Sequence, residues 1–320
     1  MDRRDDVRML SPMTSSATQA AIPILPGYRL ERVLGRGGMG TVYLGLQLSI
    51  NRSVAIKIPH ANRLRNAADV AAFFQEARAA CQLHHPGLVT VHDLVQRPEE
   101  NLYACVMEYV PGVTAGDLVH RDGPLPIAKA LAIAGQAAAA LAHAHAHGFI
   151  HRDVKPENLL VTPAGAVKLL DLGLAYNRVG GLGTGTGSSG GQRRLVILGT
   201  PEYAAPEQCR NPDDADETSD VWSLGATLVH LLTGKPPFDG GTVIDLIVNA
   251  ATRPLDLPPH LTGPVRQLLE TFLAKDPDQR YADAGIAAEA IAAVAAGRPP
   301  LRPDGSVRPR RRMLPRRRMR

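Results

Sequence analysis

The chain has 320 residues, of which 44% are hydrophobic, and its formal net charge is +5. A chain of this length and apolar content buries a substantial core, which excludes disorder throughout and allows one large domain or two smaller ones. The positive charge comes from the C-terminal end, because residues 298–320 hold ten arginines and one acidic residue and leave a net charge of −4 on residues 1–297.

The first third of the chain predicts a small β-sheet with one helix. Residues 1–27 form a polar leader that we expect to be disordered. Strand-like alternation then runs into a glycine-rich stretch and resumes after it, which indicates a hairpin with a glycine turn. The expected strands are residues 28–34, 41–44, 54–58, 88–95 and 102–109, and the expected helix covers about 67–83.

From residue 111 onward the pattern favours helices. Residues 179–191 interrupt it; they are almost entirely glycine, serine and threonine, have too little to bury, and predict a mobile loop. The whole chain is therefore expected to be an α+β protein with a larger, mainly α second half. Its expected helices are residues 126–147, 219–233, 265–274 and 282–296.

Cysteine usage and apolar runs bear on location. Cys81, Cys105 and Cys209 lie far apart without a CxxC pair, so neither a disulfide framework nor a zinc site is indicated. The leader carries both signs of charge and no long apolar run, unlike a signal peptide. The longest weakly polar segment, residues 284–297, has 14 residues and falls short of a membrane span. We expect a cytoplasmic protein without a transmembrane span.

Residues 151–158, His-Arg-Asp-Val-Lys-Pro-Glu-Asn, carry the most chemistry. They place the carboxylate of Asp153, the ammonium group of Lys155 and the amide of Asn158 at spacings suited to phosphoryl transfer. This pattern indicates an enzyme.

Residues 35–42 match the pattern GxGxxGxV. An ordinary glycine hairpin is the simpler interpretation, but a position between two strands disfavours a dinucleotide fold and suits a loop over nucleotide phosphates. Glycine is needed there because a side chain would keep backbone N–H groups away from the phosphates.

Lys57 lies on a strand with apolar neighbours, where a lysine often simply points into solvent. Glu76 follows 19 residues later on the predicted helix and could hold the ammonium group against the α- and β-phosphates of a nucleotide. We therefore favour a functional lysine, because a buried lysine needs such a partner.

These motifs, taken in order, resemble those of the protein kinase family over about residues 28–297. The style is similar to bacterial serine/threonine kinases of the eukaryotic type, and Lys155 favours serine or threonine over tyrosine as acceptor. The resemblance implies a two-lobed protein kinase fold with an N-lobe at 28–110, a C-lobe at 111–297 and a disordered arginine-rich tail at 298–320. The further motifs that carry it are Asp171-Leu172-Gly173, Ala205-Pro206-Glu207, residues 220–225 and Arg280.

The resemblance also implies catalytic roles and cofactors. Asp153 would orient the acceptor hydroxyl, Lys155 would stabilise charge on the γ-phosphoryl group, and Lys57 with Glu76 would position ATP. The metal ligands would be Asn158 and Asp171, holding Mg²⁺ or alternatively Mn²⁺.

The ATP site implied by the resemblance lies between the lobes. The adenine would sit between Val42 and Ala55 on one side and Leu160 on the other, although plain core packing also explains these residues. Glu108 and Val110 would offer backbone hydrogen bonds, with Met107 at the rear. The full set of expected ATP-binding residues is Leu34, Gly35, Arg36, Gly37, Gly38, Met39, Gly40, Val42, Ala55, Lys57, Met107, Glu108, Val110 and Leu160.

Other matching residues would be structural. The resemblance implies that Glu207 pairs with Arg280, that Asp220 braces the backbone before Asp153, and that Thr200 bonds Asp153 and Lys155. Three alternating histidines, His143, His145 and His147, are interpreted as helix-end residues rather than metal ligands, because a spacing of two points side chains apart.

The segment before Thr200 departs from the family. Relatives of this type carry regulatory threonines where this chain has Gln192 and Arg194, neither of which accepts phosphate. We expect phosphorylation in the glycine-rich insert instead; activity without loop phosphorylation is the alternative. The candidate residues are Thr184, Thr186, Ser188 and Ser189.

The expected activity is transfer of the γ-phosphoryl group of ATP to serine or threonine of proteins, including the kinase itself. A pseudokinase without transfer is one alternative, which the filled catalytic positions disfavour. Another is a nucleic-acid-binding protein driven by the tail of residues 298–320, which could also contact an anionic membrane.

Overall fold

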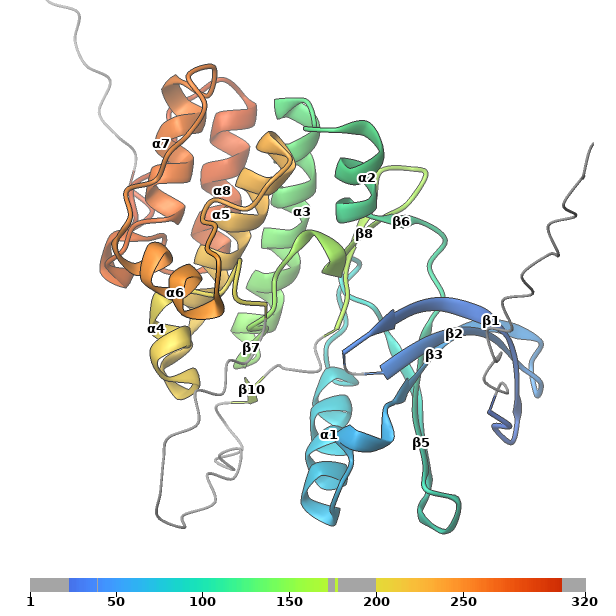
Figure 1. The fold of residues 1–320 in the computed structure, drawn as a ribbon. Helices are drawn as coiled ribbons and strands as arrows, with labels where there is room; N and C mark the ends of the chain where they lie inside the picture. Colours follow the sequence, from blue (N-terminus) through green and yellow to red (C-terminus); the bar gives the residue numbers. More distant parts are fainter. Residues whose placement is uncertain (1–22, 39, 172–175, 178–199, 307–320) are drawn as a thin grey trace, which may run out of the picture.

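The structure, a computed structural model, describes residues 23–38, 40–171, 176–177 and 200–306. In Figure 1 the chain folds into two lobes, a sheet with one flanking helix and a larger bundle of helices. The expected two-lobed α+β architecture, with a β-rich N-lobe and a mainly α C-lobe, is confirmed.

The N-lobe is a five-stranded antiparallel sheet in the order β1-β2-β3-β5-β4 within the described residues. Its small core consists of β-branched and small side chains from the central strands β3 and β5, including Val54, Ile56 and Val106, which are fully buried. The elements are β1 (Tyr28–Gly37), β2 (Gly40–Gln47), β3 (Arg52–Pro59), α1 (Ala67–Ala80), β4 (Val91–Arg97) and β5 (Leu102–Glu108).

The C-lobe is built around α3 and α5, which pack against α7 and α8. Alanines on the buried face of α3, such as Ala134, Ala138 and Ala144, allow close packing of the neighbouring helices because they have only a methyl group. The helices are α2 (Ala115–Asp122), α3 (Ile127–Ala146), α4 (Pro206–Arg210), α5 (Glu217–Thr233), α6 (Val243–Thr252), α7 (Gly263–Phe272) and α8 (Ala284–Ala295).

Short strands flank the segments of the candidate site, because residues 151–158 lie between β7 and β8 and Asp171 follows β9. β8 pairs with both β6 and β9, and β7 pairs with β10, in each case antiparallel. They are β6 (Val113–Thr114), β7 (Phe149–Ile150), β8 (Leu159–Val161), β9 (Val167–Leu169) and β10 (Tyr176–Asn177).

Three helices, α2, α4 and α6, were not expected from the sequence. Two of them, α2 and α6, begin with a capping box, in which Thr114 pairs with Asp117 and Thr242 pairs with Asp245. A threonine followed three residues later by an acidic residue is a helix-start signal, so the sequence contains a signal for the start of both helices.

Residues 284–297 are not, as was expected, the longest weakly polar segment, because helix α3 is longer. Within the described residues α3 alone has the length and composition to cross a membrane. Half of its apolar window is buried, and it packs against α5 and α8 as a core helix of the C-lobe.

Residues 298–306, which the sequence assigned to the tail, contact the C-lobe. Leu301 packs against the hydrophobic core, and the amide of Ala282 donates to the carbonyl of Pro303 at 3.2 Å. Residues 307–320 lie outside the described residues, so binding of nucleic acid or an anionic membrane by the tail stays a prediction.

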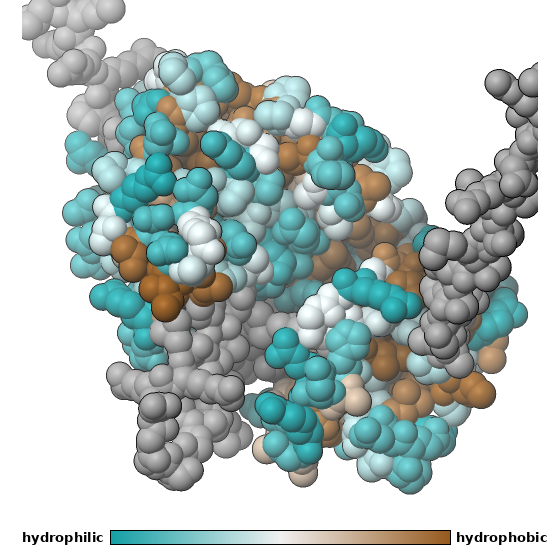
Figure 2. Space-filling model, in the orientation of Figure 1, coloured by the Kyte–Doolittle hydropathy of each residue, from teal (hydrophilic) through white to brown (hydrophobic). Residues whose placement is uncertain are grey.

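Helix α6 exposes an apolar surface. Figure 2 shows a brown area over this helix at the lower left of the C-lobe, where Val243, Ile244 and Val248 are exposed. Most of the remaining visible surface of the C-lobe is hydrophilic.

Candidate active site

The carboxylate of Asp153 is the centre of the site. One oxygen, Oδ1, accepts the amide hydrogen of Thr200 at 2.9 Å and its hydroxyl hydrogen at 2.8 Å. The other, Oδ2, lies 2.8 Å from Nζ of Lys155 and accepts from Nδ2 of Asn158 at 3.1 Å. The structure thus brings together Asp153, Lys155, Asn158 and Thr200, as the sequence motifs indicated.

Thr200 also accepts a hydrogen bond from Nζ of Lys155 on its hydroxyl oxygen, so it links the carboxylate to the ammonium group. The ammonium group of Lys155 lies between the carboxylate and this hydroxyl. A positive charge fixed beside a potential proton acceptor suits transfer of a negatively charged group to a hydroxyl.

The backbone before Asp153 is held by helix α5. Asp220, completely buried, accepts the amide hydrogens of His151 at 2.7 Å and Arg152 at 2.8 Å. Burial by itself raises the pKa of Asp220, but hydrogen bonding and charge from His145 and His151 outweigh it and lower this pKa. Asp220 therefore stays ionised where the catalytic segment begins.

His145 was missed as a site-supporting residue. Its Nε2 lies 2.9 Å from Oδ2 of Asp220, and its side chain is 5% exposed, although it was interpreted only as a helix-end residue. His143 and His147 lie one turn apart, with ring centroids 4.4 Å from each other, and Nδ1 of His147 lies 2.8 Å from the carbonyl oxygen of His143. Helical spacing separates His145 from the other two histidines, because residues 143 and 147 are related by i, i+4 and share one face of the helix.

Lys57 reaches across the cleft to Asp171. Its Nζ lies 2.5 Å from Oδ1 of Asp171, with 12% of the lysine side chain exposed. Asp171 has a left-handed backbone with φ +55°, a conformation that costs energy for a non-glycine residue and concentrates at functional sites. Glu76 lies on α1, and its side chain is outside the described part of the structure, so its pairing with Lys57 stays a prediction.

Asn158 and Asp171 are the candidate metal ligands. Nδ2 of Asn158 donates to the carbonyl and carboxylate of Asp153, which leaves the amide oxygen as the donor atom for a cation. Oxygen donors fit a hard divalent cation. Within the described residues no group of three or more His, Cys, Asp or Glu could hold a metal.

The glycine-rich hairpin closes with Gly37 opposite Gly40. A Cβ on Gly40 would lie 2.3 Å from the carbonyl oxygen of Ile58, so only glycine fits this approach. Two contacts were not foreseen: Nε of Arg63 donates to the carbonyl of Gly38, and Nε2 of His60 lies 3.0 Å from that of Gly37. The expected ATP-binding residue Met39 lies outside the described residues.

The other expected ATP-binding residues lie on strands of both lobes or next to them, and their role in binding ATP stays a prediction. Ala55 pairs across the sheet with Met107, and Val42 pairs with Lys57. Leu160 lies on β8 in the C-lobe. It packs close to Gly112, since a Cβ added to Gly112 would lie 3.2 Å from Cγ of Leu160. Of the rest of the set, Leu34, Gly35 and Arg36 lie on β1, Glu108 is the last residue of β5, and Val110 follows β5.

Behind Met107 lies a cavity of about 70 Å³, lined among others by Lys57, Cys105 and Asp171. Burial raises the pKa of the Cys105 thiol to about 12 although nearby Lys57 lowers it. Cys105 is therefore a neutral lining residue rather than a nucleophile.

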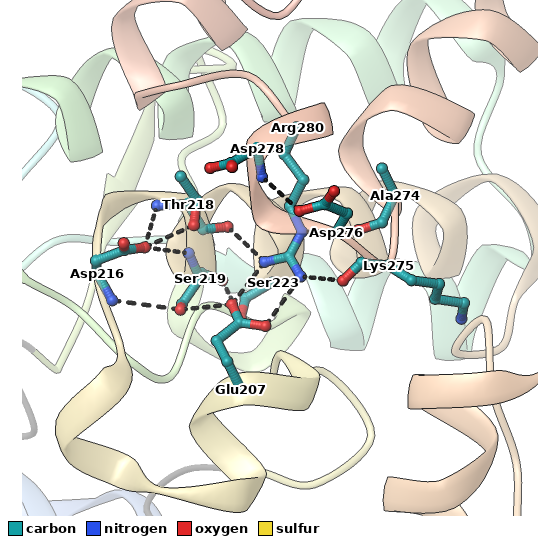
Figure 3. A network of polar contacts seen from close by, with 10 residues as sticks. All are labelled: Glu207, Asp216, Thr218, Ser219, Ser223, Ala274, Lys275, Asp276, Asp278 and Arg280. Carbon is teal, nitrogen blue, oxygen red and sulfur yellow. Dashed lines mark hydrogen bonds and ion pairs between the residues drawn. The ribbon is translucent and has the colours of Figure 1, made fainter.

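A buried ion pair in the C-lobe joins Glu207 and Arg280, as the resemblance implied (Figure 3). Nη1 and Nη2 of Arg280 bond the two carboxylate oxygens of Glu207 at 2.6 and 2.9 Å, and Arg280 also donates to backbone carbonyls, including that of Thr218. Burial raises the pKa of Glu207, but the hydrogen bond and charge of Arg280 outweigh it and lower this pKa. The pair ties α4 to the segment before α8.

Comparison with known proteins agrees with this geometry. The protein kinase domain family matches residues 28–293. The serine/threonine-protein kinase PknA of Mycobacterium tuberculosis is 38% identical over 288 residues, which cover 89% of this chain and 65% of PknA. Serine/threonine-protein kinase PknB is 38% identical in Mycolicibacterium smegmatis (264 residues; 79% of this chain, 40% of PknB) and 37% identical in M. tuberculosis (283 residues; 86% and 44%).

The chain therefore belongs to the protein kinase family, and its resemblance to bacterial kinases of the eukaryotic type is confirmed. It spans 65% of the length of PknA and less than half of PknB. Membership of the family implies use of ATP and a divalent metal. The regulatory candidates Thr184, Thr186, Ser188 and Ser189 lie outside the described residues.

Proposed function

We propose that this chain is a serine/threonine protein kinase that transfers the γ-phosphoryl group of ATP to hydroxyl groups of proteins, including its own. The observation that carries the proposal is the arrangement of Asp153, Lys155 and Thr200, in which a carboxylate, an ammonium group and a hydroxyl bond one another. The names of the bacterial relatives support serine and threonine as acceptors.

In this proposal each side chain has one task. Asp153 accepts a hydrogen bond from the acceptor hydroxyl and orients its oxygen toward the phosphorus, and Lys155 stabilises the charge on the transferred group. Lys57 leaves Asp171 and binds the α- and β-phosphates when the nucleotide enters. Asn158 and Asp171 would hold Mg²⁺, which would neutralise charge on the phosphates; Mn²⁺ would suit the same oxygen ligands.

The acceptor residue type is tested with a peptide array. The purified chain is incubated with labelled ATP, Mg²⁺ and a peptide array in which serine, threonine and tyrosine occupy the same position. Label on serine and threonine peptides supports the proposal. Label on tyrosine peptides alone contradicts it.

We further propose that Thr184, Thr186, Ser188 or Ser189 accepts the regulatory phosphate, because the usual positions hold Gln192 and Arg194. A phosphate there would be an anion that Arg152, in the catalytic segment, could bind. Phosphopeptide mapping after incubation with ATP tests this, with the inactive Asp153→Asn protein as control. If none of the four is modified in an active protein, phosphorylation of the insert is not required.

A further inference from the structure

Lys168, on β9 of the C-lobe, bonds two segments of the N-lobe. Its Nζ donates to Oε2 of Glu108 at 2.8 Å and to the carbonyl oxygen of Leu88 at 3.1 Å. Glu108 is the last residue of β5, directly before the connection to the C-lobe, and Leu88 lies between α1 and β4. One ammonium group therefore joins β9 to two separate segments of the other lobe.

Backbone hydrogen bonds hold the same segments together. The amide of Glu108 donates to the carbonyl of Thr90 at 2.8 Å, and the amide of Thr90 donates to Oε2 of Glu108 at 3.3 Å. On the C-lobe side, the amide of Leu169 donates to the carbonyl of Gly87 at 2.7 Å. The carboxylate of Glu108 is thus shared between Lys168 and the segment 87–90.

The pair is shielded more than an ordinary surface ion pair. The exposed fraction is 16% for the side chain of Lys168 and 31% for that of Glu108. Partial removal from water strengthens the attraction, and each charge has a further hydrogen-bonding partner. The contact is therefore suited to fixing the position of β9 relative to the end of β5, which exposed ion pairs do poorly.

From these contacts we propose that Lys168 is a positioning residue that, through Glu108, sets the link between the lobes for nucleotide binding. This inference rests on the proposed function only in taking ATP as the nucleotide. With its carboxylate held by Lys168 and Thr90, Glu108 presents backbone rather than side chain to the cleft. Loss of the ion pair frees the end of β5 and weakens adenine binding without changing the residues around Asp153.

Two variants test the pair: Lys168→Met, which keeps much of the apolar stem, and Glu108→Gln, which keeps the shape. The Kd for ATP with Mg²⁺ is measured by calorimetry, and kcat and KM are measured separately. We expect each variant to raise Kd and KM for ATP about fivefold while kcat changes less than about twofold. The double variant should resemble either single one, because residues acting as a unit are not additive.

Two matched variants serve as controls. Lys168→Arg retains the charge and should restore most of the affinity for ATP. Arg97→Met breaks the pair of Arg97 with Glu100, 3.2 Å apart within the N-lobe, and should leave the Kd for ATP unchanged. Glu108→Gln keeps the test open if Lys168→Met fails to fold.

Several results would overturn the inference: unchanged Kd values in both single variants, losses that multiply in the double variant, or a fall in kcat at constant KM. Failure of the proposed function has a different signature. A wild-type protein that binds ATP but transfers no phosphate contradicts kinase activity, and its Kd values still decide the role of Lys168.

Discussion

Asp220 holds Arg152 in a left-handed backbone conformation. The φ angle of Arg152 is +67°, and its amide donates to Oδ1 of Asp220 at 2.8 Å. Such a conformation is costly for a residue with a long side chain, and it persists only where the surroundings compensate. The residue that follows is Asp153, so the direction of the candidate catalytic carboxylate depends on a buried aspartate on α5.

Replacing Asp220 with asparagine should destabilise the protein. The amide oxygen can accept one of the two amide hydrogens, but the NH₂ group then faces the other N–H donor. We expect a loss of about 2–3 kcal/mol in the free energy of unfolding, as for other buried hydrogen bonds to charged groups that are left unsatisfied. Urea denaturation measures it. Asp239→Asn, at a side chain that is 84% exposed, should change stability by less than about 0.5 kcal/mol; equal losses in both variants would contradict the role of Asp220.

Removing one partner of the Glu207–Arg280 pair should cost more stability than replacing both side chains with apolar ones. Arg280→Met leaves the buried carboxylate of Glu207 without its main partner and should cost about 3–5 kcal/mol of stability. The double variant Glu207→Leu with Arg280→Met should cost less than the sum of the single variants, because no unpaired charge remains. Denaturation of all three proteins tests this prediction, and strict additivity would show that the two side chains act independently.

Lys155→Met should separate catalysis from nucleotide binding. Nζ of Lys155 contacts Asp153 and Thr200 rather than any residue of the expected adenine site. We expect kcat to fall about 100-fold with the Kd for ATP within about twofold of wild type, since loss of a charge on the transferring group affects mainly the transition state. Lys129→Met, at an exposed lysine on α3, is the control. A change in Kd that accounts for the whole loss would contradict this role.

Stability should fall below neutral pH. Burial lowers the pKa of His143, with further lowering by His147, His85 and His84; burial also lowers the pKa of His230. Because the unfolded chain binds these protons more readily, stability is fully present above the unfolded pKa of about 6.5 and is lost as pH falls below it. Urea denaturation between about pH 7.5 and about pH 5.5 should show this loss. The free energy of unfolding should depend less steeply on pH in His143→Phe. An unchanged slope in that variant, matching the exposed control His120→Asn, would contradict the contribution of His143.

The short motif around Asp153 could be predicted from sequence because its members lie within eight consecutive residues. Lys57 and Asp171, 114 residues apart, could be placed together only through family resemblance. The sequence spacing indicated Glu76 as the partner of Lys57, which stays a prediction, whereas the described contact of Nζ of Lys57 is with Asp171. A contact that depends on how the lobes meet has no local pattern in the sequence.

The same reason explains what was missed. Lys168 and Glu108 are 60 residues apart on two strands, and His145 and Asp220 are 75 residues apart on two helices. No spacing rule connects such residues. By contrast, α2 and α6 had local capping signals that could have been used.

The most direct measurement of the central claim is phosphate transfer from labelled ATP by the wild-type protein and by Asp153→Asn, with Mg²⁺ and a serine- or threonine-containing peptide. Nucleotide binding is measured on both proteins to show that the substitution leaves the ATP site intact. The account predicts transfer by the wild type and a loss of at least about 100-fold in Asp153→Asn at similar affinity for ATP. Transfer that persists in the variant, or is absent from a wild type that binds ATP, would contradict it.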